Sequence, residues 1–273
     1  MSCQRNRKME RNILLTIQYD GTNFSGWQRQ PNARTVQGEI EAVLSKICGR
    51  PMQINGTSRT DAGVHALGQR ASFKGDFGIP TDRIQLAANN MLAATVGTPR
   101  QCADVRIVQV EEMPMDFHAR FDCKGKTYRY IIRHGCEADV FQRNYAYQLK
   151  EKLDVEAMRE GAKYIVGTHD FACFQAAGGT PRETTVRTIF DLQVLERDEE
   201  TIWIEVTGDG FLYNMVRIIV GTLVEAGQGR KTAASIADII TSSDRRNAGH
   251  TAPAEGLYLK EIYYDAEEMK KGR

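Results

Sequence analysis

The sequence predicts an α/β (α+β) protein built from two similarly ordered halves, and three observations support this prediction. Apolar residues alternate with period two in some stretches and recur with helical spacing in others, so both strands and helices are expected. The order of these elements begins again after Pro114. No Gly/Ser-rich linker separates the two parts. We therefore expect a pseudo-repeat whose sheets meet and leave a groove at their junction.

The first half opens with a strand in which hydrophobic and polar residues alternate. Thr35 is a suitable N-cap for the helix that follows, because the apolar residues after it fall on one helical face. A second strand and helix come next, and a further strand ends this half. The expected elements are strands 13–19, 69–73 and 105–110 and helices 36–47 and 81–94.

The second half repeats the alternation and adds a hairpin. The expected elements are strand 127–133, helix 154–166 ending at Gly167, hairpin strands 189–195 and 202–207, helices 211–226 and 233–240, and strand 257–263. We accordingly divide the chain into a basic N-terminal extension (1–12), an N-terminal half (13–115), a C-terminal half (116–265) and a C-terminal tail (266–273).

The composition, 41% hydrophobic and 26% charged, is that of an ordinary globular protein. No stretch approaches the roughly 18 consecutive apolar residues of a membrane span, so we expect a cytoplasmic protein without a membrane segment. The six cysteines form no C-x-x-C pair, which favours free thiols and gives no support to a zinc site. The net charge of +1, from 36 basic and 35 acidic residues, does not by itself indicate an anionic partner.

Basic residues are nevertheless concentrated in two places. One cluster lies at the N-terminus, and the second lies in residues 117–133, where basic and aromatic side chains are interleaved. Such interleaving can hold phosphates and stack bases, although a solvated strand face explains it equally well. The residues concerned are Arg5, Arg7, Lys8 and Arg11, and then Phe117, Arg120, Phe121, Lys124, Lys126, Tyr128, Arg129, Tyr130 and Arg133.

Several catalytic motifs fail on inspection. Gly125-Lys126-Thr127 resembles the end of a P-loop, but position 120 is arginine where that motif needs glycine. Gly208-Asp209-Gly210 lacks the third glycine of a dinucleotide fingerprint, because Tyr213 occupies its place. The chain has no H-x-x-x-H pair and no G-x-S-x-G elbow, so zinc hydrolases and serine hydrolases lose their support.

The loop 56–65 is the strongest candidate site, because small and polar residues there carry Arg59 and Asp61 two positions apart. An alternative is that Asp61 caps a turn and Arg59 is solvated. Arg217 lies in a helix that is apolar on nearly every face, so its guanidinium needs either a carboxylate or a route to water along its aliphatic stem. Tyr128 shares a strand face with Tyr130, where it can face a site or belong to the core.

These segments together resemble the tRNA pseudouridine synthase A family, and the resemblance extends over residues 13–263. The ordered set of motifs carries it. Two departures are Arg70, where an apolar residue is expected, and the run 172–174. The matching segments are Tyr19–Thr22, Gly26–Gln30, Thr35–Gln37, Arg59–Ala66, Phe117–Phe121, Lys126–Tyr130, Gly167–Phe171, Arg187–Ile189, Asn214–Gly221 and Glu255–Leu259.

The resemblance implies an isomerase that converts uridine to pseudouridine in the anticodon stem-loop of tRNA, at positions 38, 39 and 40, with no metal or organic cofactor. It implies two ferredoxin-like halves that form a continuous mixed, largely antiparallel sheet flanked by helices, with a central basic cleft. It also implies a homodimer. Two other classes remain as alternatives, a non-catalytic RNA-binding module and a small-molecule enzyme, and tritium release from C5-labelled uridine in RNA would separate them from an isomerase.

The resemblance also assigns roles to residues. Asp61 is the essential carboxylate, acting either as a nucleophile at the ribose C1′ or as a base on a ribose proton. Arg59 fills the space that the flipped uridine leaves, Tyr128 stacks on the uracil, and Arg217 pairs with Asp61. Three residues in the matching segments are expected to bind the substrate as well, namely Arg29, His65 and Arg120.

Overall fold

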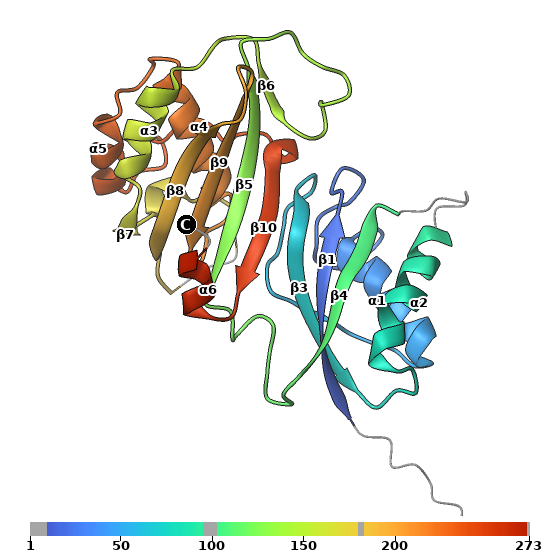
Figure 1. Cartoon of the computed structure of the whole chain (residues 1–273). Coiled ribbons are helices and arrows are strands. Elements are labelled where there is room, and N and C mark those ends of the chain that lie inside the picture. The colour runs from blue at the N-terminus through green and yellow to red at the C-terminus, as the bar shows by residue number, and fades with distance from the viewer. Residues whose placement is uncertain (1–9, 95–102, 180–182, 272–273) are drawn as a thin grey trace, which may run out of the picture. The chain divides into compact units, whose positions relative to one another are not determined.

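The structure is a computed structural model that describes residues 10–94, 103–179 and 183–271 (Figure 1). The chain forms two compact units that divide between Cys123 and Lys124. Each unit combines a largely antiparallel sheet with helices, which confirms the predicted α+β class. Most of the basic N-terminal cluster, including Arg5, Arg7 and Lys8, lies outside the described residues.

The first unit has the βαββαβ order of a ferredoxin-like fold. Its strands pair in the spatial order β4-β1-β3-β2, and every pair is antiparallel. The strand β2 has only two residues, so it is a much shortened edge strand. The elements are β1 Arg11–Tyr19, α1 Val36–Cys48, β2 Asn55–Gly56, β3 His65–Gly75, α2 Thr81–Ala94 and β4 Val105–Met113.

Alternation along β1 builds the core of this unit, because Ile13, Leu15 and Ile17 are all fully buried. The helix α1 begins as predicted, with the Thr35 hydroxyl accepting a hydrogen bond from the Gly38 amide. The helix α2 covers the free edge of β4. There the Asn89 side chain donates to the Ile107 carbonyl at 2.8 Å and accepts from the Ile107 amide at 2.9 Å, which protects an edge strand from further pairing.

The segment that follows β4 packs on one face of the same sheet. The Asn12 side chain donates to the carbonyls of Pro114 and Phe117, at 2.7 and 2.8 Å. The Ala119 amide donates to the Ser72 hydroxyl at 3.2 Å. These polar strand residues are buried. The backbone of the segment satisfies the Asn12 amide nitrogen and donates to the Ser72 hydroxyl, whereas Asn12 Oδ1 has no hydrogen-bond partner among the described residues.

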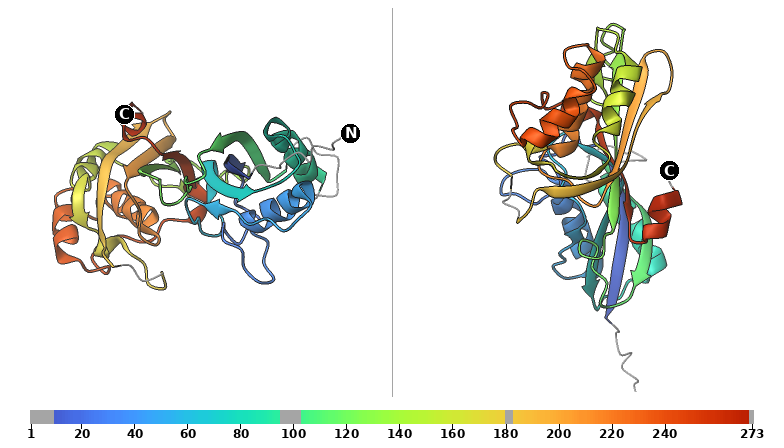
Figure 2. Two further views of the ribbon diagram at one scale, coloured as in Figure 1. Left: turned by 90° about the horizontal axis from the view of Figure 1, so that it is seen from below. Right: turned by 90° about the vertical axis from the view of Figure 1, so that its left-hand side faces the viewer.

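The second unit repeats the same topology, since β5, α3, β8, β9, α4 and β10 again follow the βαββαβ order. The strand order is β10-β5-β9-β8, with β7 added beside β8 and β6 paired in parallel with β5. The helices α3 and α4 lie side by side against one face of this sheet (Figure 2). The elements are β5 Gly125–His134, β6 Tyr147–Leu149, α3 Val155–Lys163, β7 Gly167–Asp170, η1 Ala172–Phe174, β8 Val186–Glu196, β9 Thr201–Gly208, α4 Met215–Gly227, α5 Ser235–Ser242, η2 Ala254–Gly256, β10 Leu257–Tyr263 and α6 Ala266–Lys271.

Two predicted helices have a limit that differs from the structure by three or more residues. The third helix ends at Lys163 rather than at residue 166, and Gly167 is the first residue of β7. The helix expected over 211–226 begins only at Met215, because Asn214 has a left-handed backbone with φ of 59° and therefore cannot continue a right-handed helix. The predicted helix 81–94 and strand 257–263 match their observed bounds. Across residues 10–94, 103–179 and 183–271, the structure contains no helix long and apolar enough to cross a bilayer.

Candidate active site

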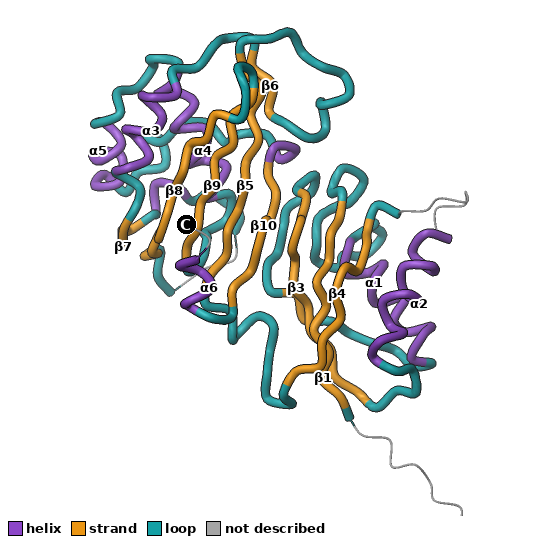
Figure 3. The backbone as a smooth tube through the Cα atoms, in the orientation of Figure 1, coloured by secondary structure: helices purple, strands orange, loops and turns teal. Residues whose placement is uncertain are grey.

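The predicted site residues fall on both units. Arg29, Arg59, Asp61, His65 and Arg120 belong to the first unit, and Tyr128 and Arg217 belong to the second. Asp61 lies in the loop of residues 57–64 between β2 and β3. Because β1 and β3 are antiparallel, with Tyr19 opposite Ala66, this loop lies at the same end of the sheet as the long loop after β1 (Figure 3).

The Asp61 loop is fixed at its start by the side chain of Gln69, which is completely buried. The Gln69 amide nitrogen donates to the Ser58 carbonyl at 2.7 Å, and its oxygen accepts from the Ser58 amide at 3.2 Å. One side chain thus serves both main-chain groups of a loop residue. Charge patterns do not reveal this role, and the signal in the sequence is only a polar residue within a strand.

Three further hydrogen bonds tie the loop to its surroundings. The hydroxyls of Tyr19 and Thr60 lie 2.7 Å apart, and the Trp27 amide donates to the Thr60 carbonyl at 3.0 Å. The Thr57 hydroxyl donates to the Ala119 carbonyl at 2.9 Å. The loop is therefore anchored to the sheet, to the loop after β1 and to the segment after β4.

These hydrogen bonds determine which side chains of the loop are exposed to solvent. Ser58 and Thr60 are buried, whereas Arg59 is exposed and Asp61 is partly exposed. The Val64 amide donates to the main-chain carbonyl of Asp61 at 3.2 Å, so a main-chain hydrogen bond closes this turn. The structure thus presents a carboxylate and a guanidinium, two positions apart, on a loop whose intervening residues are held in place.

His65 follows the loop and is only 2% exposed. Its Nδ1 accepts a hydrogen bond from the Gly21 amide at 3.0 Å and lies 3.3 Å from an Asp20 carboxylate oxygen. At Gly21 a Cβ would come within 2.1 Å of the Val64 carbonyl oxygen, so glycine permits this close approach. The position of His65 suits the support of two loops better than a direct contact with RNA.

Arg29 belongs to the loop after β1, and its side chain is 60% exposed. Its Nη1 lies 3.3 Å from a carboxylate oxygen of Glu41, a residue of α1 that is almost fully buried. The same carboxylate accepts from the Ile54 amide at 3.0 Å. Sequence reasoning missed Glu41, and its signal is a charged residue on the apolar face of a helix.

Arg120 lies in a tight turn after β4. The His118 amide donates to the Asp122 carboxylate at 2.7 Å and the His118 ring stacks on Phe121 at 4.3 Å, so the turn is well fixed. Arg120 and Phe121 are both exposed, and the Arg120 guanidinium lies 5.9 Å from the Phe121 ring. This arrangement presents a cation beside an aromatic surface, which suits contact with a nucleic acid.

Tyr128 is buried in β5 and packs edge-on against Phe211, with ring centroids 5.1 Å apart. Phe211 lies in the turn that leads into α4, near Asn214. Arg217 is in the first turn of α4, where its Nε donates to the Ala252 carbonyl at 2.6 Å and its Nη1 donates to the Asn214 side chain at 3.0 Å. Polar partners therefore hold this guanidinium, and its pairing with Asp61 stays a prediction.

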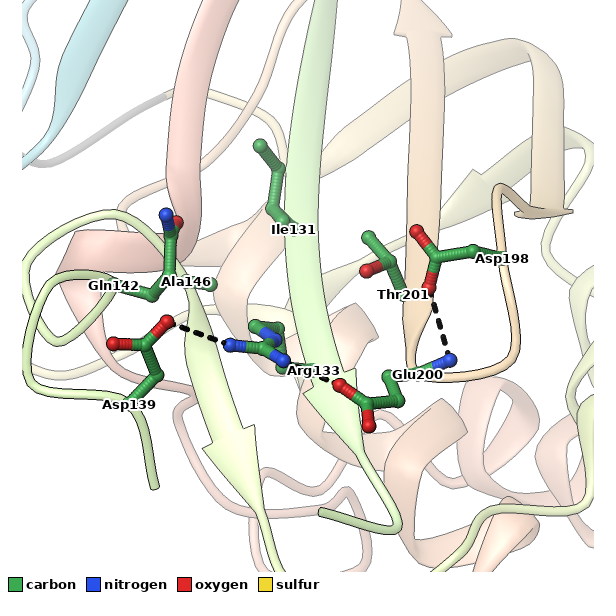
Figure 4. A pocket seen from close by; sticks show the side chains of 8 residues that line it. All are labelled: Ile131, Arg133, Asp139, Gln142, Ala146, Asp198, Glu200 and Thr201. Carbon is green, nitrogen blue, oxygen red and sulfur yellow. Dashed lines mark hydrogen bonds and ion pairs between the residues drawn. The ribbon is translucent and has the colours of Figure 1, made fainter. Parts of the chain in front are cut away.

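The basic and aromatic stretch 117–133 has two parts, the exposed turn around Arg120 and the strand β5. The arginines of β5 are paired with carboxylates. Arg129 forms an ion pair with Glu205 at 2.6 Å and stacks on Trp203 at 3.8 Å. Arg133 pairs with Asp139 and Glu200 at a pocket of about 400 Å³ (Figure 4). Asp139 and Glu200 compensate the charge of Arg133. Glu205, by contrast, pairs with Lys260 as well as with Arg129, so a single carboxylate faces two cations there. The pocket contains none of the predicted site residues.

No group of three or more His, Cys, Asp or Glu side chains in the described part of the chain is arranged to hold a metal ion. Cys48, Cys123, Cys136 and Cys173 are free thiols. Burial raises the pKa of the Cys173 thiol to about 11, which makes it a poor nucleophile near neutral pH.

Comparison with known proteins identifies relatives over most of the chain. The family model for tRNA pseudouridine synthase matches residues 15–122 and 162–265. A protein of Acetivibrio thermocellus named tRNA pseudouridine synthase A is 49% identical over 93% of this chain and 100% of its own length. A Clostridium tetani protein named tRNA pseudouridine synthase A 2 is 46% identical over 94% and 100%. A solved Cbf5-Nop10-Gar1 complex matches 90% of this chain and 56% of that chain at 10% identity, with a TM-score of 0.32, which is too low to support an argument.

Proposed function

The chain belongs to the tRNA pseudouridine synthase family, and from this premise we propose that it modifies uridines 38, 39 and 40 in the anticodon stem-loop of tRNA, with Asp61 as its essential carboxylate. It is an isomerase that converts uridine to pseudouridine. The observation that carries the role of Asp61 is the anchored loop, which holds the main chain on both sides of a partly exposed carboxylate.

The reaction breaks the bond between uracil N1 and ribose C1′ and forms a bond between C5 and C1′. The C5 proton leaves and N1 gains a proton, so there is no net oxidation or hydrolysis. An ionised carboxylate can serve either as a nucleophile at C1′ or as a base that removes a ribose proton. Both routes need Asp61 to be fixed in front of the ribose, and the hydrogen bonds of Ser58 and Thr60 support this.

A uridine within a stem must leave the base stack before its C1′ can be reached. Arg59 is exposed and lies two residues before Asp61, so its long side chain suits the space that the base leaves. Arg29 and Arg120 are exposed on the same unit and are proposed to contact phosphates. His65 is proposed to act at the binding site indirectly, through the loop positions that it holds.

Tyr128 and Arg217 complete the proposed site, as the resemblance implies. Tyr128 stacks on the target uracil and assists removal of the C5 proton, and Arg217 pairs with Asp61 to keep the carboxylate ionised. The packing of Tyr128 on Phe211 and the two polar anchors of Arg217 hold these side chains in fixed positions, which both roles require. We further propose that the enzyme works as a cytoplasmic homodimer and that its binding to tRNA weakens with salt.

The test is release of tritium from tRNA labelled at uridine C5, measured at matched RNA occupancy. The wild type should release tritium, and Asp61→Asn should release none while binding tRNA within a small factor of wild type. Asp116→Asn, at an exposed carboxylate after β4, is the matched control and should retain full activity. Full activity of Asp61→Asn would exclude Asp61 as the essential carboxylate, and an inactive wild type that still binds tRNA would favour a binding module.

A further inference from the structure

The segment of residues 249–253 lies in close contact with the helix α4. The Gly249 amide donates to the Thr222 hydroxyl at 2.9 Å. A Cβ at Gly221 would come within 1.9 Å of the His250 carbonyl oxygen, and a Cβ at Gly249 would come within 2.6 Å of Thr222. Glycine on both sides therefore allows this segment to approach the helix backbone more closely than other residues permit.

The same segment holds Arg217 at the start of the helix. Its residue Ala252 is fully buried, accepts from Arg217 Nε at 2.6 Å and donates its own amide to the Arg217 carbonyl at 3.1 Å. The next residue, Pro253, accepts a hydrogen bond from the hydroxyl of buried Tyr130 at 2.7 Å. The direction of the guanidinium thus depends on where residues 252 and 253 lie.

The other end of the segment is held by a chain of three side chains. The Glu225 carboxylate accepts from the His250 amide at 2.9 Å and lies 3.1 Å from His250 Nδ1. His250 Nε2 lies 3.2 Å from the Tyr147 hydroxyl, and the two rings meet edge-on. An imidazole ring with its proton on Nδ1 satisfies both ring contacts, because it donates to Glu225 and accepts from Tyr147.

The electrostatics of this group favour an anchor over a second reactive centre. Burial alone would raise the pKa of the Glu225 carboxyl, but the hydrogen bonds from His250 and the nearby Lys231 outweigh it and hold that pKa below its usual value. Burial raises the pKa of the Tyr147 hydroxyl, so this tyrosine is not activated as a nucleophile.

We propose that Glu225, His250 and Tyr147 are positioning residues, which fix the segment 249–253 and through the Ala252 carbonyl hold Arg217 in the orientation its role requires. This inference rests on the proposed function of Arg217. The contacts of the segment run along one face of α4, from Glu225 in its last turn to Arg217 in its first. Loss of the Glu225 anchor should therefore change the orientation of the Arg217 guanidinium.

A double-mutant cycle tests the coupling, because residues that act through one another give non-additive effects. Glu225→Ala should lower the single-turnover rate of pseudouridine formation by about 10-fold, the scale of a small misplacement of a reacting group, and leave the Kd for tRNA unchanged. In an Arg217→Lys background the same change should have almost no further effect. Glu225→Gln retains a hydrogen-bond acceptor for His250 and should restore most of the rate.

The matched control is Glu151→Ala. Glu151 accepts a hydrogen bond at 2.8 Å from Gln228, just after the same helix, and its described contacts do not include residues 249–253. It should leave the rate unchanged. If Glu225→Ala proves too unstable to purify, Tyr147→Phe removes only the hydroxyl that contacts His250 and is a milder change. It is tested in the same double-mutant cycle, and we expect a few-fold loss of the single-turnover rate.

The outcomes separate this inference from the proposed function. If Glu225→Ala lowers the rate by the same factor in the Arg217→Lys background as in wild type, the anchor acts only through the general stability of the protein. That result would overturn the inference. Unchanged rates in Glu225→Ala and Tyr147→Phe would overturn it as well. In both cases the tritium release by wild type and its absence in Asp61→Asn would still stand, so the assignment of the enzyme would not be affected.

Discussion

Replacement of Gln69 by leucine should release the start of the Asp61 loop while keeping the side chain close in size. Gln69 is fully buried in β3, and its amide bonds to both main-chain groups of Ser58, at 2.7 and 3.2 Å. Leucine can make neither hydrogen bond. The change therefore tests whether a single buried amide sets the position of the loop.

The expected loss can be worked from these two contacts. A buried donor or acceptor that loses its partner costs about 1–3 kcal/mol, so the two Ser58 groups together give roughly 2–6 kcal/mol. Leucine recovers part of this, because burying an apolar side chain avoids the cost of burying an amide, roughly 1–3 kcal/mol. We expect the free energy of unfolding to fall by about 1–3 kcal/mol, and the rate of tritium release to fall by about 10- to 100-fold because Arg59 and Asp61 lose their fixed geometry.

The measurement combines urea unfolding with single-turnover tritium release. Arg70→Ala, the neighbouring position in β3, is the control. Arg70 pairs with Glu111 at 2.7 Å, with side-chain exposures of 23% and 38%, and a partly exposed ion pair contributes only about 0–1 kcal/mol. If Gln69→Leu is as stable and as active as Arg70→Ala, the loop does not depend on this amide and the reasoning is wrong.

Three further predictions concern packing, pH and RNA binding. Gly221→Ala should lower the thermal midpoint sharply, because its Cβ would lie 1.9 Å from the His250 carbonyl oxygen; an unchanged midpoint would show that the segment can move aside. Burial lowers the pKa of His134, which accepts from the Leu153 amide at 3.0 Å, so its contribution to stability is present above about pH 6.5 and is lost as pH falls through the folded-state pKa. Urea unfolding at several pH values should show this slope in wild type and a smaller one in His134→Gln. Arg120→Ala should weaken tRNA binding and reduce the salt slope of log Kd by about one; an unchanged slope would mean that Arg120 makes no phosphate contact.

Local patterns in the sequence were sufficient for most of the fold. Alternation predicted the longer strands but not the short strands β6 and β7. Helical spacing predicted α1 and α2, and Thr35 was recognisable as an N-cap because capping needs only residues a few positions apart. The ferredoxin-like order of each half came from the family resemblance, and the strand pairings confirm it for both units. The late start of α4 was missed because the left-handed conformation of Asn214 leaves no mark in the hydrophobic pattern.

The candidate site was also partly visible, since the Arg59 and Asp61 loop is distinctive by its own composition. The partners that hold each side chain were not visible, because they come from distant parts of the chain. The sequence did not show that Arg129 pairs with Glu205, which is 76 residues away. From the sequence, burial of Arg217 in an apolar helix appeared costly. The structure shows that its guanidinium donates to the carbonyl of Ala252, 35 residues later in the chain.

The sequence by itself thus determined most of the elements, the class of fold and the loop that carries the proposed carboxylate, because these depend on spacing within one segment. Only the tertiary structure decided which charges are already neutralised and which backbone groups hold the site, such as Gln69 on Ser58 and Ala252 on Arg217. The physical reason is that hydrogen bonds and ion pairs depend on distances of a few ångströms between atoms, and only folding brings distant segments that close together.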